Sequence, residues 1–295
     1  MKSVITQNFA RPLQPRPMDC APANLLVIGD HFDEVAQRGA GGGQGQALVW
    51  NPEALDQAPS TCAWDLIGAA VDAPAADRLA QHLLSPVLDN RLASFFVPEA
   101  SLLVANMLLA ASCCGATFAD VLDWVWQEDA SPAAHALRGY GEFDAYEDVL
   151  TFQAQDGITQ GSAWETTQMA LKPLNYGPVL DAIARPSTER ISAPAPFSAL
   201  HVPAGTPLRP SVTVQVLRSK SSPYSGVAAA PVDELLRAAS EHARPTTVLE
   251  LNTYGRTGTT GRSSTKSRGP PLNGSLPPLR SRPCTFRPEH HCDLR

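Results

Sequence analysis

A glycine-rich segment, Gly39-Ala-Gly-Gly-Gly-Gln-Gly45, is the first place in this chain where the residue types could bind a phosphate group. A phosphate-binding P-loop follows a strand, opens a helix and ends in Lys followed by Ser or Thr, which reach the phosphates and Mg²⁺. Here a predicted helix precedes the glycines and a predicted strand follows them, and no lysine in the chain follows a glycine. A flexible turn is the better interpretation.

An acidic pair in Val232-Asp-Glu-Leu235 resembles the Walker B acids that bind Mg²⁺ in ATPases. It lacks the preceding run of hydrophobic residues that would make it a buried strand. Acidic residues are favourable in the first turn of a helix because they compensate the helix dipole. The sequence therefore favours a helix start here over a nucleotide site.

Other chemistry-bearing groups form no recognised pattern. Cys284, His290, His291 and Cys292 could bind zinc, but their spacing matches no common zinc site. Seven carboxylates in the predicted helices could do acid–base or metal chemistry, and more simply form a solvated helix face: Asp120, Asp123, Glu128, Asp129, Asp144, Glu147 and Asp148. No Ser or Cys has a nucleophile-elbow context. We therefore assign no catalytic, cofactor-binding or metal-binding residue, and no cofactor.

The chain changes character near Ala184. Residues 1–184 contain 8 Lys/Arg and 22 Asp/Glu, a net charge of −14, whereas residues 185–295 contain 15 and 7, a net charge of +8. The negative charge of residues 1–184 disfavours DNA binding by this part of the chain, since it repels the negative phosphate backbone. The basic second part could contact nucleic acid through phosphates, but it lacks interleaved aromatic residues for base stacking.

Hydrophobic patterning supports a folded first part. Strands are predicted at 24–28 and 46–50, around a helix at 31–38, and this unit should belong to a parallel sheet. Helices are predicted after this unit, and residues 211–217 and 231–244 could add a strand and a helix. The predicted helices span residues 75–84, 98–114, 117–126, 131–139, 142–155 and 157–171, and a final short turn is predicted at 179–184.

Cysteine usage and hydropathy indicate a cytoplasmic protein. The six cysteines form no CxxC pair and no disulfide framework, which fits a reducing compartment. The N-terminus shows no signal-peptide pattern. The apolar run 102–116 is shorter than the roughly 20 residues that a membrane span needs, so we expect a buried core helix and no transmembrane segment.

The order of elements over residues 24–183 resembles a known family. A strand, a helix ending in Arg-Gly and a strand ending in Asn-Pro come first, and Trp64-Asp-Leu follows them. Later come Phe95-Phe96, Thr117-x-x-Asp-Val-Leu-x-Trp124-Val, and Gly161-Ser-x-Trp-x-Thr-x-x-x-Ala-Leu171. This is similar to the middle region of actinobacterial type IV secretion coupling proteins of the TraG/TraD type. The resemblance covers just over half of the chain, and the matching positions are structural rather than catalytic.

Members of that family are DNA-translocating ATPases of the inner membrane, with a RecA-like core and an inserted all-helical domain. The resemblance implies a Walker A loop before the first strand and Walker B after the helices, and this chain shows neither motif at those places. It implies that the helical domain lies on the cytoplasmic side and meets DNA or substrate-carrying partners. It does not carry ATPase activity over to this chain.

The sequence thus predicts a mainly α protein with a small α/β part. We expect an incomplete RecA-like P-loop NTPase fragment at 1–90, an all-helical domain at 91–184, and a Pro/Arg/Ser-rich, largely disordered or non-native tail at 185–295 that out-of-frame reading could produce.

The functional prediction is a truncated or degenerate coupling-protein-like component without ATPase activity. Its expected partners are other secretion or conjugation proteins or full-length coupling-protein subunits, which could hold it near the inner membrane. Two alternatives stay open: a stand-alone helical interaction module with a disordered basic tail, and part of a split ATPase completed in trans.

Overall fold

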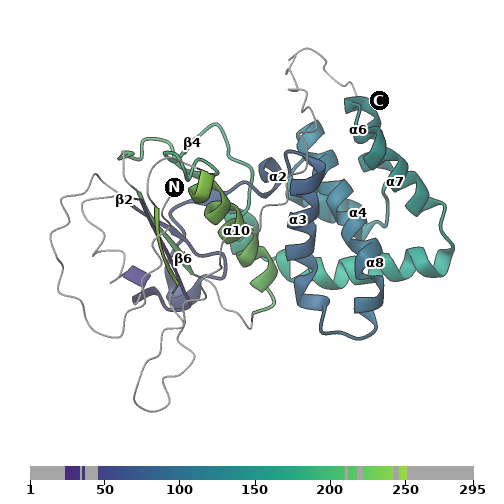
Figure 1. The fold of residues 1–295 in the computed structure, drawn as a ribbon, viewed down its shortest axis with the longest axis horizontal. Coiled ribbons are helices and arrows are strands. Elements are labelled where there is room, and N and C mark those ends of the chain that lie inside the picture. The colour runs from purple at the N-terminus through teal and green to yellow at the C-terminus, as the bar shows by residue number, and fades with distance from the viewer. Residues whose placement is uncertain are drawn as a thin grey trace, which may run out of the picture. The chain divides into compact units, whose positions relative to one another are not determined.

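The described residues form a parallel sheet, a small antiparallel sheet and a set of helices (Figure 1). The computed structural model describes residues 24–33, 35–36, 46–209, 212–217, 222–241 and 246–250, all of them within one compact unit, Met1–Thr265. This part of the chain is mostly helical, as the sequence predicted.

Four parallel strands make the larger sheet, in the order β2-β6-β1-β7. Their bounds are β1 Asn24–Gly29, β2 Gln46–Trp50, β6 Val212–Leu217 and β7 Thr246–Glu250. The predicted strands at 24–28 and 46–50 are confirmed, and both belong to a parallel sheet. They are not neighbours, because β6 lies between them: Val214 is opposite Leu26 on one side and Leu48 on the other.

Both faces of this sheet are buried, which explains why its strands read as continuous apolar runs. Leu26, Leu48 and Val214 belong to the main hydrophobic core, which extends into the helices. Leu25, Val27 and Val49 point to the opposite face and form a second, smaller cluster with Val35. Successive side chains of a strand alternate between faces, so each strand contributes to both clusters.

Eight α-helices occupy the described sequence between β2 and β4. The 22-residue helix α4 is central and packs against α3, α5, α6, α7 and α8. Most of its apolar residues are buried, including Met107 and Leu108. The bounds are α2 Leu66–Ala69, α3 Ala73–Leu84, α4 Ala93–Cys114, α5 Phe118–Trp126, α6 Ser131–Tyr140, α7 Phe143–Gln153, α8 Gly157–Leu171 and α9 Gly177–Ala182, with 3₁₀ turns η1 Leu55–Gln57, η2 Ser85–Val87 and η3 Lys172–Leu174.

Helix α3 lies within the segment predicted as α/β, residues 1–90, and it packs mainly against α4 and also against α10. Residues such as Leu79 and Leu83 on α3 are buried in the same core as α4.

Helix α4 begins earlier than its sequence suggests. Pro98 was expected in its first turn, but the helix begins at Ala93 and Pro98 lies inside it. The side-chain oxygen of Asn90 accepts hydrogen bonds from the backbone N–H groups of Leu92 and Ala93, at 3.0 and 3.3 Å. This cap supplies a start signal upstream of the proline, whose missing N–H removes one helical bond.

Local signals set the other boundaries near α4. The helix ends at Gly115, which adopts the left-handed conformation with φ 78°, as a C-terminal glycine often does. The predicted capping box at the start of α5 is confirmed, since Thr117 and Asp120 bond to each other's backbone N–H groups.

Regular structure continues past Ala184 as far as residue 250, so the start of the disordered tail predicted at residue 185 is placed too early. Strands β4 Arg190–Ser192 and β5 Leu200–Pro203 pair antiparallel with each other, and β5 pairs with β3 Ala63–Trp64. The strand and helix predicted at 211–217 and 231–244 are confirmed as β6 and as α10 Ser225–Glu241, which begins earlier than expected. Residues 251–295 lie outside the described residues. The composition of residues 185–250 did not reveal these elements, because the strands that pair with β6 are distant in sequence.

Helix α4 is the one described helix that is long and apolar enough to cross a membrane. Its most apolar window has a mean hydropathy of 1.6, and 56% of that window is buried inside the protein. A core helix of this length and composition passes the same test.

We expect a chain that ends at residue 184 to lose its parallel sheet, since it lacks the strand between β1 and β2. A chain that ends at residue 250 keeps all four strands and should unfold cooperatively. Circular dichroism during thermal unfolding, with limited proteolysis, compares the two. Equal midpoints and equal protease resistance would show that β6 is dispensable.

Gly226 should not tolerate a side chain. A Cβ atom there would overlap the carbonyl oxygen of His82 and lie 3.1 Å from Cδ of Pro86. We expect Gly226→Ala to destabilise the protein by about 1–3 kcal/mol. Gly161→Ala is the matched control, because no atom lies within 4 Å of a Cβ at this position in α8. It should be neutral or stabilise by up to about 1 kcal/mol. Urea unfolding measures both, and equal effects would contradict the close contact.

Candidate functional site

The acidic pair of the Val232–Leu235 motif lies on a helix, as predicted, and not on a strand. It sits in the middle of α10, however, and not in its first turn, because α10 already begins at Ser225. Val232 and Leu235 are buried in the main core, whereas Asp233 and Glu234 point toward helix α3.

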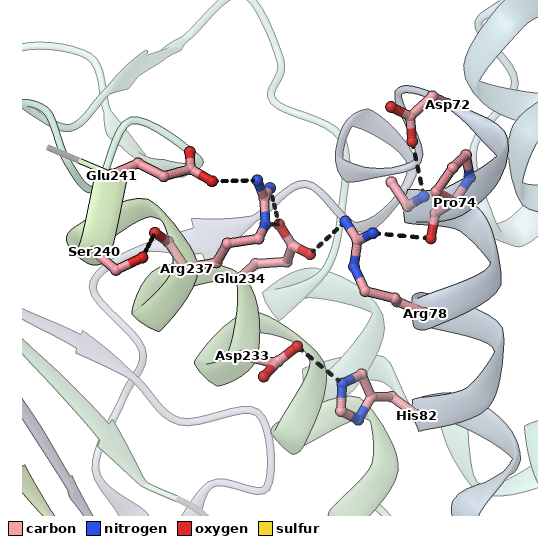
Figure 2. A network of polar contacts seen from close by, with 10 residues as sticks. Asp72, Pro74, Arg78, His82, Asp233, Glu234, Arg237, Ser240 and Glu241 are labelled. Atoms are coloured by element: carbon pink, nitrogen blue, oxygen red, sulfur yellow. Dashed lines mark hydrogen bonds and ion pairs between the residues drawn. The ribbon is translucent and has the colours of Figure 1, made fainter. Parts of the chain in front are cut away.

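Asp233 and Glu234 make polar contacts with α3, and the contact of Glu234 with Arg78 is an ion pair (Figure 2). Glu234 Oε1 lies 3.3 Å from Nη2 of Arg78, and Asp233 Oδ2 lies 3.6 Å from Nε2 of His82. Arg78 and His82 are four residues apart, so they share one face of α3. The acidic pair therefore has a structural role that the sequence could not reveal.

The network extends along α10 itself. Arg237 donates from Nε to Oε2 of Glu234 at 3.1 Å, and its Nη2 also contacts this oxygen. Arg237 Nη1 donates to Oε1 of Glu241 at 3.1 Å. The hydrogen bond to Glu234 raises the pKa of Arg237 above its already high value, so this side chain is a permanent cation. Glu234 thus binds Arg78 from α3 and Arg237 from α10.

Apolar packing supports these ion pairs. Helix α10 packs against α3, and Val227, Ala230 and Leu235 belong to the same buried core as Leu79 and Leu83. Gly226 allows the close approach to the His82 carbonyl. We call this contact, with its ion pairs and its packed residues, the α3–α10 joint.

A second polar cluster lies on the small antiparallel sheet. Ser192 and His201 are directly opposite in β4 and β5, with Ser192 Oγ and His201 Nδ1 3.5 Å apart. Asp65, just after β3, accepts from the Gly68 N–H at 2.8 Å and lies 4.0 Å from Arg185 Nε. Sequence reasoning missed this grouping of Ser, His and Asp, because the three residues come from separate segments.

The electrostatics of this cluster favour a neutral imidazole. Burial lowers the pKa of His201, Asp65 opposes that shift, and Arg190 adds to it. The Asp65 carboxylate is engaged in capping α2 and in pairing with Arg185. The long contact between Ser192 and His201 is a weak hydrogen bond, and it does not by itself activate a nucleophile.

The carboxyl edge of the parallel sheet is where open α/β sheets bind ligands. Here polar groups at that edge form hydrogen bonds with the η1 turn. Asn51, directly after β2, donates to the carbonyls of Leu55 and Ala58 and accepts from the Leu55 N–H. Asp56 accepts from the Phe32 N–H at 2.7 Å, just after β1. These groups hold the turn in place.

The seven carboxylates of the helical part lie at its surface, most of them exposed. Asp120 serves the capping box, and hydrogen bonds from Ser131 lower the pKa of Asp129. An open groove of about 580 Å³ lies near them, lined by Trp126, Glu165, Gln168, Met169, Lys172 and Asn175. Within the described ranges, no group of three or more His, Cys, Asp and Glu residues could hold a metal ion.

Three sequence hypotheses concern residues that the structure does not describe. The Gly39–Gly45 loop and the set of Cys284, His290, His291 and Cys292 lie outside the described residues, and so do residues 251–295 of the basic part, 185–295, for which nucleic-acid contact was predicted. They stay predictions.

Comparison with known proteins finds no relative. No protein-family model, no curated protein sequence and no solved structure matches this chain.

The described cysteines should differ in reactivity. Burial raises the pKa of the Cys62 thiol to about 12, with nearby Arg190 only partly opposing the shift. At about pH 8 only on the order of one Cys62 in ten thousand is then a thiolate, whereas Cys114 is exposed. We expect iodoacetamide to modify Cys114 at least about tenfold faster. Peptide mapping by mass spectrometry measures both sites. The urea-unfolded chain is the control, where equal rates are expected; equal rates in the folded chain would contradict the burial of Cys62.

Proposed function

We propose that this chain is a coupling-protein-like component of a type IV secretion or conjugative DNA-transfer system. It acts through protein contacts of its helical part and does not turn over nucleotide by itself. One observation carries the proposal: helices α2–α9 are inserted in sequence between strands β2 and β6 of a single parallel sheet.

That arrangement agrees with what the family resemblance implies. Coupling proteins of the TraG/TraD type have a RecA-like α/β core with an inserted all-helical domain. In this chain β1 and β2 precede the helices, and β6 follows them and pairs with both strands. A fold of this order explains why residues 24–183 resemble the middle of such proteins while their catalytic motifs are not recognisable.

The described acidic groups support a role without nucleotide turnover. The acidic pair that could have served as Walker B lies on α10 and holds Arg78, His82 and Arg237. A Walker B acid binds Mg²⁺ from the end of a buried strand, and a helical carboxylate in ion pairs has a different position and a different role.

The charge of the helical part favours proteins over DNA as partners. Acidic side chains such as Asp123, Asp144 and Glu147 are exposed on α5 and α7. Such a surface repels the phosphate backbone of DNA and attracts basic protein surfaces. We propose other secretion proteins or full-length coupling-protein subunits as the partners, which would recruit the chain to the cytoplasmic face of the inner membrane.

Affinity purification of the full chain from its native cells tests the proposal. We expect mass spectrometry to show enrichment of DNA-transfer and secretion subunits, and calorimetric titration with Mg-ATP to show no saturable binding. The triple variant Asp123→Asn, Asp144→Asn and Glu147→Gln should reduce the enrichment, because it removes three exposed negative charges.

An unrelated protein of equal size and net charge is the control for charge-driven capture. Enrichment that does not exceed this control would contradict the proposed partners. Saturable micromolar binding of Mg-ATP to the purified chain would contradict the absence of nucleotide handling, independently of the partners.

A further inference from the structure

Helix α10 belongs to two parts of the described fold. In sequence it is the connection from β6 to β7, the two strands that flank β1. In space it packs against α3, which in turn packs against the central helix α4. A displacement of α3 relative to α10 therefore acts on the ends of two strands in the sheet.

The two ends of the α3–α10 joint are built differently. Near the C-terminus of α3, the two backbones are in close contact, because Gly226 faces the His82 carbonyl and Pro86. Toward the N-terminus of α3, the contact between side chains is the ion pair of Arg78 and Glu234, at the edge of the apolar core (Figure 2). One end is suited to act as a pivot, and the other is held by charge.

The charged end can separate with both side chains still hydrogen-bonded. Glu234 keeps its bonds to Arg237, which lies on the same helix. Arg78 keeps its bond from Nη1 to the carbonyl oxygen of Pro74, 3.1 Å away on its own helix. Burying a charge without a partner is the main electrostatic penalty of breaking an ion pair, and Glu234 avoids it through Arg237, while Arg78 keeps a hydrogen bond and partial exposure to water.

Water also reaches this end. The side chain of Arg78 is 37% exposed, whereas that of Glu234 is 11% exposed. Dissolved salt screens the exposed guanidinium and so weakens this pair, although less than it weakens a fully exposed pair.

We propose that the α3–α10 joint is an ionic latch that regulates how firmly the helical part is coupled to the parallel sheet. The latch is closed at low ionic strength by Arg78 and Glu234. It opens when salt, or a charged partner that competes for either side chain, weakens this pair, and the Gly226 end acts as the pivot. This inference stands apart from the proposed function, since it rests on contacts within the chain.

Hydrogen–deuterium exchange of the full chain tests the latch. In the wild type we expect amides in 73–79 and 233–241 to exchange about two- to fivefold faster at about 0.5 M than at about 0.05 M NaCl. Arg78→Met and Glu234→Gln should each give the faster exchange already at low salt and should lose most of the salt response. The double variant should exchange no faster than Glu234→Gln alone, because that change already removes the pair with Arg78 together with the pair with Arg237.

Arg138→Met is the matched control, since Arg138 is an exposed arginine on α6, away from the joint. It should leave the exchange of both segments and their salt response unchanged. The wild-type salt series does not depend on any variant folding correctly. A salt response that is absent, or that is equal in α4 and in the joint, would overturn the proposal, and so would additive effects in the double variant.

Discussion

Parallel strands that lie two positions apart in a sheet need a third strand between them. Strands β1 and β2 are in this situation, and the strand that joins them is β6. Its six residues are all buried, and the strand pairs with β1 on one side and with β2 on the other. The described α/β part therefore depends on a segment that follows all of α2–α9 in the sequence. The entropic free-energy cost of closing a loop grows slowly with its length, by about 0.6 kcal/mol for each doubling. An insertion of this length is therefore tolerable.

The same requirement shapes the helical part. An insertion that leaves a sheet and returns to it must bring its two ends close together. Helix α3 near the start of the insertion packs against α10, which directly follows β6 in the chain order. The central helix α4 then provides the apolar surface on which α3, α5, α6, α7 and α8 pack. The contact that brings the two ends of the insertion together and the packing around α4 share helix α3, so each stabilises the other.

Most local elements could be predicted from the sequence, because their signals are local. The capping box of Thr117 and Asp120, the terminal Gly115 and the apolar runs of β1 and β2 each act within a few residues. The extent of the fold could not be predicted in this way. Composition changes near Ala184, yet β6 is stabilised by strands far away in sequence, and no local count of charge or proline can detect that.

The same reasoning applies to the acidic pair on α10. Its sequence is compatible with a metal-binding strand or with a helix, and only the positions of Arg78 and His82 show what the carboxylates bind. An acid that holds a cation on a neighbouring helix lowers the cost of its own partial burial. Because Glu234 holds Arg237 as well, α10 remains electrostatically balanced whether or not α3 is in contact. The charges that resemble a nucleotide motif therefore serve the connection between helices and sheet, and they link the stability of that connection to the ionic surroundings.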